Sequence, residues 1–263
     1  MPQFSANIST LFCELPFPER IAAARKAGFR AVEIQFPYDI PLEQWLETKR
    51  RSKMRVALIN VSAGDLTSGG SGLAAVPGRE AGFQAAVKEC ARYAKALTVP
   101  VVNVLAGKPP AEFDRARCME VFVNNLRHAA NVMADIGVRV VTEPVNSRAQ
   151  PGFLISTTAE GLQAIDWAGH DNLALQYDLY HAQIMEGDLL KTLETNMARI
   201  GHIQFADVPD RHEPGTGEIN FPRVFEAIDA LGYKGSVGAE YNPSAGTENS
   251  LSWFQPYKKT QMI

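Results

Sequence analysis

The stretch LALQYDLYH, residues 173–181, has the composition of a buried parallel strand that turns polar where the strand ends. Three further apolar runs show the same pattern: VRVVTEPV at 138–145, HIQFAD at 202–207 and SVGAEY at 236–241. Each run carries one oxygen-bearing side chain where an apolar residue is expected, and these are Glu143, Asp178, Gln204 and Glu240. A buried carboxylate without a partner is costly. The recurring pattern therefore indicates a shared partner, and a divalent metal ion is the simplest one.

The rest of the chain has the same alternation of short β-branched runs and longer amphipathic segments. We expect strands at 4–9, 31–36, 56–61, 101–106, 138–143, 173–178, 201–206 and 235–240. Helices are expected at 18–27, 41–52, 79–97, 114–135, 158–168, 187–199, 221–231 and 247–257. Eight strand–helix pairs in 263 residues are typical of a (β/α)8 TIM barrel, with a doubly wound open sheet as the competing arrangement. The sequence shows no linker or composition shift that would divide it into two domains. It therefore predicts an α/β fold, with one TIM-barrel domain over 1–263.

The polar residues of the four runs fall near the C-terminal ends of expected strands five to eight. In a TIM barrel that end collects catalytic residues from several strands, so we expect the four side chains to be neighbours. All four offer oxygen, and hard oxygen ligands favour Mg²⁺ or Mn²⁺ over Zn²⁺ or Cu²⁺. For any one of them the structural alternative is a strand-end group that is hydrogen-bonded to loop amides or an Arg. The set of four favours a metal site.

Two loops that follow expected strands are unusual. Residues 62–78 (SAGDLTSGGSGLAAVPG) are long and Gly-rich, which fits either a mobile lid over the site or a flexible solvent-facing loop. Residues 207–220 are rich in Pro, Gly and charge, and they follow the strand that carries Gln204. In this loop Arg211 is either a bidentate contact for an anionic substrate group or a surface Arg paired to Asp210 or Glu213.

His181 comes three residues after Asp178, just past the end of the expected strand. A lone His is more often a structural residue, but this position favours a hydrogen bond to a substrate oxygen. His128, His170 and His202 are interpreted as structural or surface residues.

Composition excludes several classes of protein. A net charge of −3 and a pI near 6.0 argue against nucleic acid or an anionic membrane surface as a partner. Cys13, Cys90 and Cys118 form no CxxC pair, which argues against a disulfide framework or a thiolate zinc site, and we interpret them as buried apolar residues. We expect no signal peptide and no membrane span, hence a cytoplasmic protein with a small-molecule substrate. Exposed faces of barrel helices often associate, so a homo-oligomer is compatible with the sequence.

Over nearly its whole length the chain resembles the sugar isomerase/epimerase group of the xylose-isomerase-like barrel superfamily, and within that group the hydroxypyruvate isomerase family. The motifs that carry the resemblance are FSAN at 4–7, GF at 28–29, VE at 32–33, FPY at 36–38, PGRE at 77–80, EPVN at 143–146, YDLYH at 177–181, EPGTGEIN at 213–220 and GAEY at 238–241. Each motif is weak alone, and together they are specific.

The resemblance implies that the four strand-end residues bind the metal, and that Glu143 and Glu240 also flank the substrate as proton donor and acceptor. His181 and Arg211 correspond to substrate-contacting residues. Related ketose epimerases have His at the position of Gln204, so Gln favours the hydroxypyruvate isomerase branch. The implied reaction interconverts hydroxypyruvate and 2-hydroxy-3-oxopropanoate (tartronate semialdehyde), with glutamate-mediated proton transfer and a divalent metal as Lewis acid.

Three alternatives remain at this point. A 2-oxo-tetronate isomerase has the same mechanism, and its close relatives share the PDRHEP run at 209–214, although EPVN at 143–146 and PGTG at 214–217 favour hydroxypyruvate. A metal-dependent nuclease of the same superfamily needs a His-rich multi-zinc site and a basic face, which five His and a net charge of −3 disfavour. The third is a non-catalytic barrel that binds sugar acids.

Overall fold

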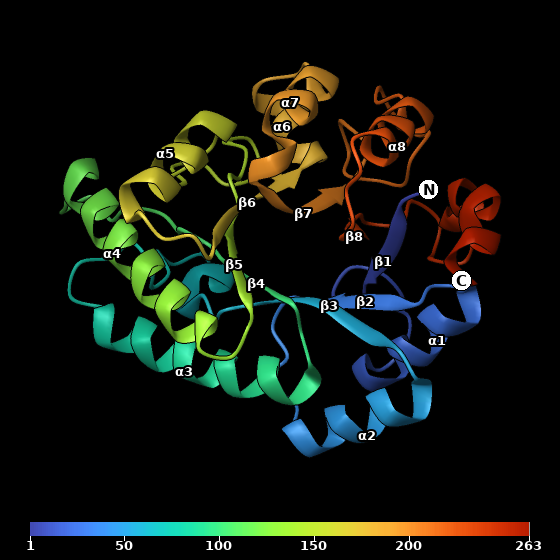
Figure 1. The fold of residues 1–263 in the computed structure, drawn as a ribbon, viewed down its shortest axis with the longest axis horizontal. Helices are drawn as coiled ribbons and strands as arrows, with labels where there is room; N and C mark the ends of the chain where they lie inside the picture. The colour runs from blue at the N-terminus through green and yellow to red at the C-terminus, as the bar shows by residue number, and fades with distance from the viewer. Residues whose placement is uncertain (263) are drawn as a thin grey trace.

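The computed structural model describes residues 1–262, and its eight parallel strands close into a barrel in sequential order (Figure 1). The strands are β1 (Gln3–Asn7), β2 (Ala31–Ile34), β3 (Arg55–Asn60), β4 (Val101–Val104), β5 (Arg139–Thr142), β6 (Leu173–Asp178), β7 (Ile200–Phe205) and β8 (Ser236–Ala239). The β1–β8 pair is also parallel and completes the ring. The predicted (β/α)8 barrel is therefore confirmed, and the open doubly wound sheet is wrong.

The helices surround the barrel on its outer side (Figure 1). They are α1 (Arg20–Ala27), α2 (Leu42–Ser52), α3 (Glu80–Leu97), α4 (Arg115–Ala134), α5 (Thr158–Ala168), α6 (Leu179–Met185), α7 (Leu189–Asn196) and α8 (Phe221–Ala230), with 3₁₀ segments η1 (Phe17–Glu19), η2 (Gly64–Ser68), η3 (Met197–Arg199) and η4 (Asn249–Met262). Their ends follow local sequence signals: α5 begins with a capping box between Thr157 and Glu160, and α1 ends at Gly28 with φ of 118°.

Three expectations need correction. The helix expected at 247–257 is the 3₁₀ segment η4, in which Pro256 lacks the backbone N–H that an α-helix would use. Helix α6 begins directly after β6, where the sequence analysis placed none, because the Asp178 carboxylate accepts from the backbone N–H of Tyr180 at 2.8 Å. Cys90 and Cys118 are buried as expected, whereas Cys13 is exposed.

Aromatic packing fixes η4 against the barrel wall and α8. The Phe4 ring of β1 meets Phe225 of α8 at 4.9 Å and Trp253 of η4 at 5.2 Å between ring centroids, both edge to face. This cluster covers the strands on either side of the β1–β8 junction. Within residues 1–262, none of the helices is both long enough and apolar enough to cross a membrane.

Candidate active site

Polar side chains stand at the C-terminal end of all eight strands. On the β1–β4 side four neutral amides lie at or near the strand ends, Asn7, Gln35, Asn60 and Asn103, while the carboxylate of β2, Glu33, comes two residues before Gln35. The β5–β8 side carries the residues predicted from the sequence: Glu143, Asp178, Gln204 and Glu240. We call these two arcs the amide side and the acidic side. The amide side was not predicted from the sequence, although each of the first four apolar runs also contains one Asn or Gln near its end.

A pocket of about 160 Å³ lies between the two sides. Four predicted site residues line it: Glu143, His181, Arg211 and Glu240. Asp178 and Gln204 are buried beside them. A larger apolar groove of about 860 Å³ between α4 and α5 contains none of the predicted site residues, so the small polar pocket is the candidate active site.

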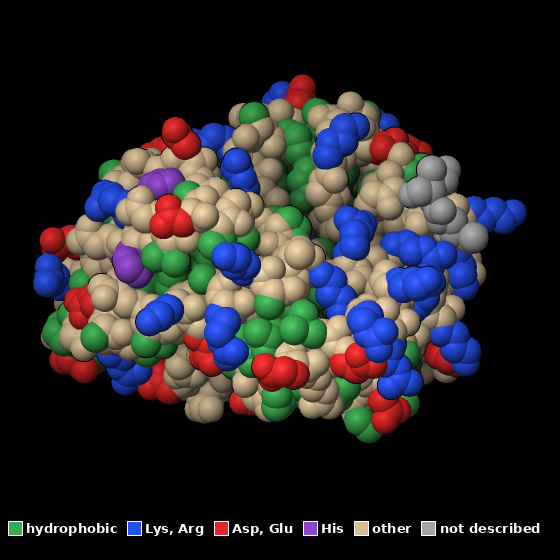
Figure 2. Space-filling model, turned by 60° about the horizontal axis from the view of Figure 1, so that its bottom comes forward, with side chains coloured by type: hydrophobic (Ala, Val, Ile, Leu, Met, Phe, Trp, Pro, Cys, Tyr) green, Lys and Arg blue, Asp and Glu red, His purple; other side chains and the backbone are tan. Residues whose placement is uncertain are grey.

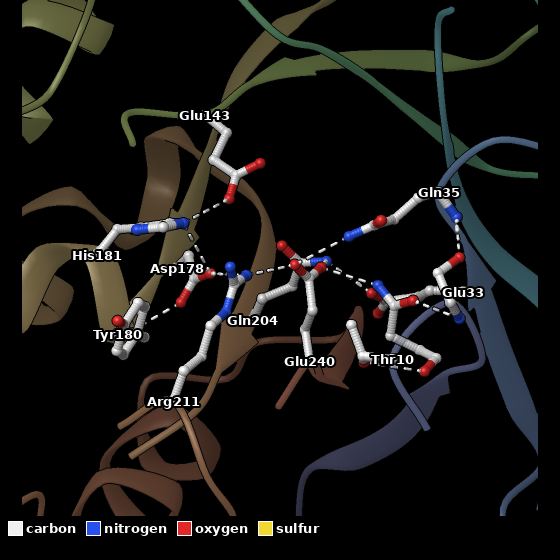
Figure 3. A network of polar contacts seen from close by, with 12 residues as sticks. Thr10, Glu33, Gln35, Glu143, Asp178, Tyr180, His181, Gln204, Arg211 and Glu240 are labelled. Carbon is white, nitrogen blue, oxygen red and sulfur yellow. Dashed lines mark hydrogen bonds and ion pairs between the residues drawn. The ribbon is translucent and has the colours of Figure 1, made fainter. Parts of the chain in front are cut away.

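Glu240 lies at the centre of the polar network (Figure 3). One carboxylate oxygen, Oε2, accepts from Asn7 at 2.8 Å and Gln204 at 2.7 Å. The other oxygen, Oε1, accepts from Arg211 at 2.5 Å and Gln35 at 3.1 Å. Loss of water around this buried group raises the pKa of Glu240 to about 7, although the Arg211 guanidinium acts in the opposite direction. A carboxyl with this pKa can both take and give a proton near neutral pH.

Glu143 has fewer partners. Its Oε2 accepts from Asn103 Nδ2 at 2.9 Å, while Oε1 lies 3.7 Å from His181 Nε2 (Figure 3). Burial raises the pKa of Glu143 well above its usual value, and the negative charges of Glu240 and Asp178 raise it further. The pocket is thus bordered by two carboxyls whose environments both favour the protonated form.

The contacts of His181 identify the ring nitrogen that carries its proton. Nδ1 lies 3.3 Å from the backbone nitrogen of Asn146 and 2.6 Å from its Nδ2, and both of these atoms are donors. Nδ1 therefore accepts, and the proton of the neutral ring sits on Nε2. Burial lowers the pKa of His181 to about 4, so the ring is neutral at pH 7. His181 consequently presents an N–H donor toward Glu143 and Asp178, which lies 3.6 Å from Nε2.

Gln204 connects the site to a buried cluster in the barrel interior. Its Nε2 donates to Glu33 at 2.7 Å as well as to Glu240, and its oxygen accepts from Gln176 at 2.5 Å. Glu33 also accepts from Ser5 at 2.6 Å and lies 3.0 Å from Nε2 of His202.

This interior cluster fixes both the residue type opposite Glu33 and the direction of the Gln204 amide. A Cβ on Gly238 would lie 2.1 Å from Glu33 Oε1, so only glycine fits there. Gln204 thus turns its amide nitrogen toward Glu240, while its oxygen faces Gln176.

The loop at 207–220 is folded around the buried carboxylate of Asp207, which accepts from four backbone N–H groups at 2.9 to 3.1 Å, those of residues 208, 215, 217 and 219. The same loop holds Arg211 in a left-handed conformation, with φ of 60°. Arg211 pairs with Glu240 and lies 3.8 Å from Asp178, so the alternative of a surface pair with Asp210 or Glu213 is wrong. The loop therefore delivers a cation into the pocket.

The Gly-rich loop at 62–78 lies over the pocket, with Leu66 and Thr67 of η2 among the lining residues. Asp65 accepts from the backbone of Gly72 at 2.8 Å and pairs with Arg79 at 2.7 Å. The carbonyl of Ser71 accepts from the backbone N–H of Lys108 at 2.9 Å. The Ser71 contact joins the loop to the segment after β4, and the Asp65 contacts join it to itself and to the N-cap of α3.

The donor set fits a hard divalent cation. Ligand atoms of Glu143, Asp178 and His181 lie within 4.8 Å of one another. Asp178 Oδ2 is buried without a hydrogen-bond donor in the described part of the chain. Three buried carboxylates face one Arg, so a dication would balance their charge. The Nε2 proton of His181 makes that residue a donor, so the carboxylates are the groups that could hold such a cation.

Comparison with known proteins agrees with this architecture. Residues 21–257 match the family described as xylose isomerase-like TIM barrel. The chain is 44% identical to a 2-oxo-tetronate isomerase of Cupriavidus necator, covering 98% of this chain and 99% of that one. It is 43% identical to the hydroxypyruvate isomerase of Escherichia coli, covering 98% and 100%.

A solved structure from Brucella melitensis, described as an AP endonuclease of family 2, is 42% identical with a TM-score of 0.94, and the match covers 98% of this chain and 99% of that one. The family match spans most of the barrel, and both curated relatives align over nearly their full length. This chain therefore belongs to the xylose isomerase-like TIM barrel family.

Proposed function

We propose that this protein is an isomerase that interconverts hydroxypyruvate and 2-hydroxy-3-oxopropanoate. The observation that carries the proposal is the pair Glu143 and Glu240, which line one small pocket from different strands and both have raised pKa values. Two such carboxyls against one substrate are the groups that a proton transfer between neighbouring carbons needs. The relatives named as isomerases of hydroxypyruvate and of 2-oxo-tetronate support the same chemistry.

The carboxylates would hold Mg²⁺ or Mn²⁺. Glu143, Asp178 and Glu240 are the ligands, and Gln204 beside Glu240 is the expected fourth. When bound, the ion would supply Lewis-acid polarisation of the substrate carbonyl and hydroxyl oxygens. The amide nitrogen of Gln204 faces Glu240 and its oxygen accepts from Gln176, so the amide would have to rotate for Gln204 to bind the ion through oxygen.

The glutamates would carry the carbon-bound proton. In hydroxypyruvate a proton leaves carbon 3 for a carboxylate and is returned at carbon 2, while the hydroxyl hydrogen passes from the oxygen on carbon 3 to the oxygen on carbon 2. No oxidant or reductant is consumed, because one carbon is oxidised as its neighbour is reduced. The pKa of Glu240, about 7, suits a group that changes protonation state in each turnover.

Two further side chains would orient the substrate. His181 offers its Nε2 proton to a substrate oxygen between Glu143 and Asp178, since its Nδ1 is occupied by Asn146. Arg211 reaches into the pocket from the loop after β7 and would bind the substrate carboxylate. Asp207 would act through Arg211 as a positioning residue.

A coupled assay of the chelator-treated protein tests the proposal. Hydroxypyruvate and 2-oxo-tetronate are offered in parallel, with Mg²⁺ or Mn²⁺ added back. We expect turnover of hydroxypyruvate that depends on the added metal. Metal-independent turnover would refute the mechanism, and absence of turnover with both acids would refute the function.

The second candidate function is isomerisation of 2-oxo-tetronate, which the 44% identical relative supports. Both activities use the same proton transfer and differ only in the substrate, so the parallel assay with the two acids separates them. A DNA-directed activity, as named for the Brucella protein, has less support. The pocket is small, and along the lower edge of the face in Figure 2 basic side chains alternate with acidic ones.

A further inference from the structure

Asn60, at the end of β3, has an amide that the fold does not use. The residue is 5% exposed and lines the pocket. Its Oδ1 is buried and has no hydrogen-bond donor within residues 1–262. The backbone of Asn60 is held firmly, because its N–H donates to the Gln35 carbonyl at 2.8 Å and its carbonyl accepts from the Tyr38 hydroxyl. A buried acceptor without a donor is unfavourable, so this amide is positioned for a ligand.

The barrel places Asn60 opposite Arg211. Strand β3 and strand β7 are four positions apart in the closed ring of eight, and Arg211 follows β7. Among the described residues that line the pocket, Arg211 is the one Lys or Arg side chain. The carboxylate of an acid substrate therefore binds at the Arg211 end, and its far end points toward Asn60.

The unpaired side-chain atom of Asn60, Oδ1, is an acceptor. A hydroxyl satisfies it, since it donates, and a carboxylate does not. The pocket of about 160 Å³ is also smaller than the ~300 Å³ at which pockets for drug-sized ligands begin, which limits the ligand to a short acid.

A three-carbon substrate has no hydroxyl left for Asn60. In hydroxypyruvate the carboxylate and the two reacting oxygens account for every oxygen. A four-carbon hydroxy keto acid has one more, on carbon 4. We propose that Asn60 is a specificity-determining residue that binds the carbon-4 hydroxyl, so that the site accepts four-carbon acids. The proposal rests on the proposed function for the identity of the reacting carbons.

Binding of two unreactive acids tests this inference independently of turnover. Glycerate and erythronate differ by one hydroxyl-bearing carbon, and neither has a carbonyl carbon to isomerise. Their Kd values are measured by calorimetry on the Mg²⁺-loaded wild type and on Asn60→Ala. We expect erythronate to bind about 5- to 10-fold more weakly to Asn60→Ala, whereas glycerate affinity changes by less than about twofold.

Gln150→Ala is the matched control, because Gln150 lines the same pocket from the segment after β5. It should leave the ratio of the two Kd values unchanged. Asn60→Ser keeps a hydroxyl at the site and should recover part of the loss, with unfolding midpoints confirming that each variant is folded. An equal change for both acids, an unchanged ratio in Asn60→Ala, or no binding of erythronate to the wild type would overturn the inference. If the Kd values follow the expected pattern but the wild type shows no turnover, only the proposed function is refuted.

Discussion

The backbone N–H of Arg211 donates to the backbone carbonyl of Asp207 at 3.0 Å, so the cation in the pocket is held by the residue that organises its loop. The Asp207 carboxylate, 1% exposed, satisfies four further N–H groups of the same loop. The guanidinium position therefore depends on a carboxylate that does not line the pocket.

Asp207→Ala should lower kcat/KM by about 10- to 100-fold, because Arg211 loses its fixed position and buried N–H groups lose their acceptor. The free energy of unfolding should fall by about 3 kcal/mol. Asp210→Ala, which removes an exposed acid from the same loop, is the control and should leave both quantities nearly unchanged. Steady-state kinetics and denaturant titration measure the two effects. Wild-type kinetics in Asp207→Ala would show that Arg211 is positioned by other contacts.

Glu143→Gln and Glu240→Gln should each reduce kcat by at least ~100-fold, because an amide cannot carry the proton. Glycerate binding to the metal-loaded variants should persist, since the amides fill the same volume. If the variants bind glycerate and keep the wild-type kcat, these glutamates do not transfer the proton.

In the metal-free protein Glu240 should contribute a loss of stability as the pH rises from about 4.5 to about 7. The pKa of Glu240 is near 4.5 in the unfolded chain and about 7 in the folded protein, so in this range the carboxyl is ionised when unfolded and protonated when folded. The loss is on the order of 3 kcal/mol. His181, with a pKa lowered to about 4, contributes a slope of opposite sign below pH 6.5.

The difference between wild type and Glu240→Gln removes the His181 contribution, because His181 is present in both, and it reports Glu240 together with its effect on Glu143. Denaturant titrations of chelator-treated protein at pH 5 and pH 7.5 supply the four free energies needed. The variant should show the smaller loss between the two pH values. Equal losses would mean that the pKa of Glu240 is not raised in the folded protein.

Asp65→Ala should raise KM roughly threefold or more with little change in kcat, because it releases the contacts that hold loop 62–78 over the pocket. The pair Asp65–Arg79 is about half exposed, so stability should change by less than about 1 kcal/mol. Glu120→Ala breaks a comparable exposed pair with Arg117 on α4 and serves as the control. An unchanged KM in Asp65→Ala would favour the solvent-loop interpretation over the lid.

The sequence predicts the barrel well because its periodicity is regular: all eight expected strands occur, with ends shifted by a few residues at most. The acidic side was predictable because Glu143, Asp178 and Glu240 interrupt apolar strands. The amide side was overlooked because Asn or Gln at a strand end is ordinary and carries no charge. Helix α6 was missed because Asp178 both ends a strand and caps a helix.

Tertiary contacts determined what the sequence left open. Arg211 had two equally plausible environments in the sequence, and the fold of its loop chose the pocket. The direction of the Gln204 amide depends on Glu33 and Gln176, which lie on other strands. Neither the proton position on His181 nor the pKa of Glu240 follows from spacing along the chain.

The division of the barrel mouth places the neutral amides of the site and its reactive carboxylates on different strands. Substitutions among neutral residues on β1–β4 leave the charge balance of the acidic side intact. Asn60 bonds neither Glu143 nor Glu240 and can be exchanged without rebuilding the reactive centre, whereas Asn7, Gln35 and Asn103 donate to those two carboxylates.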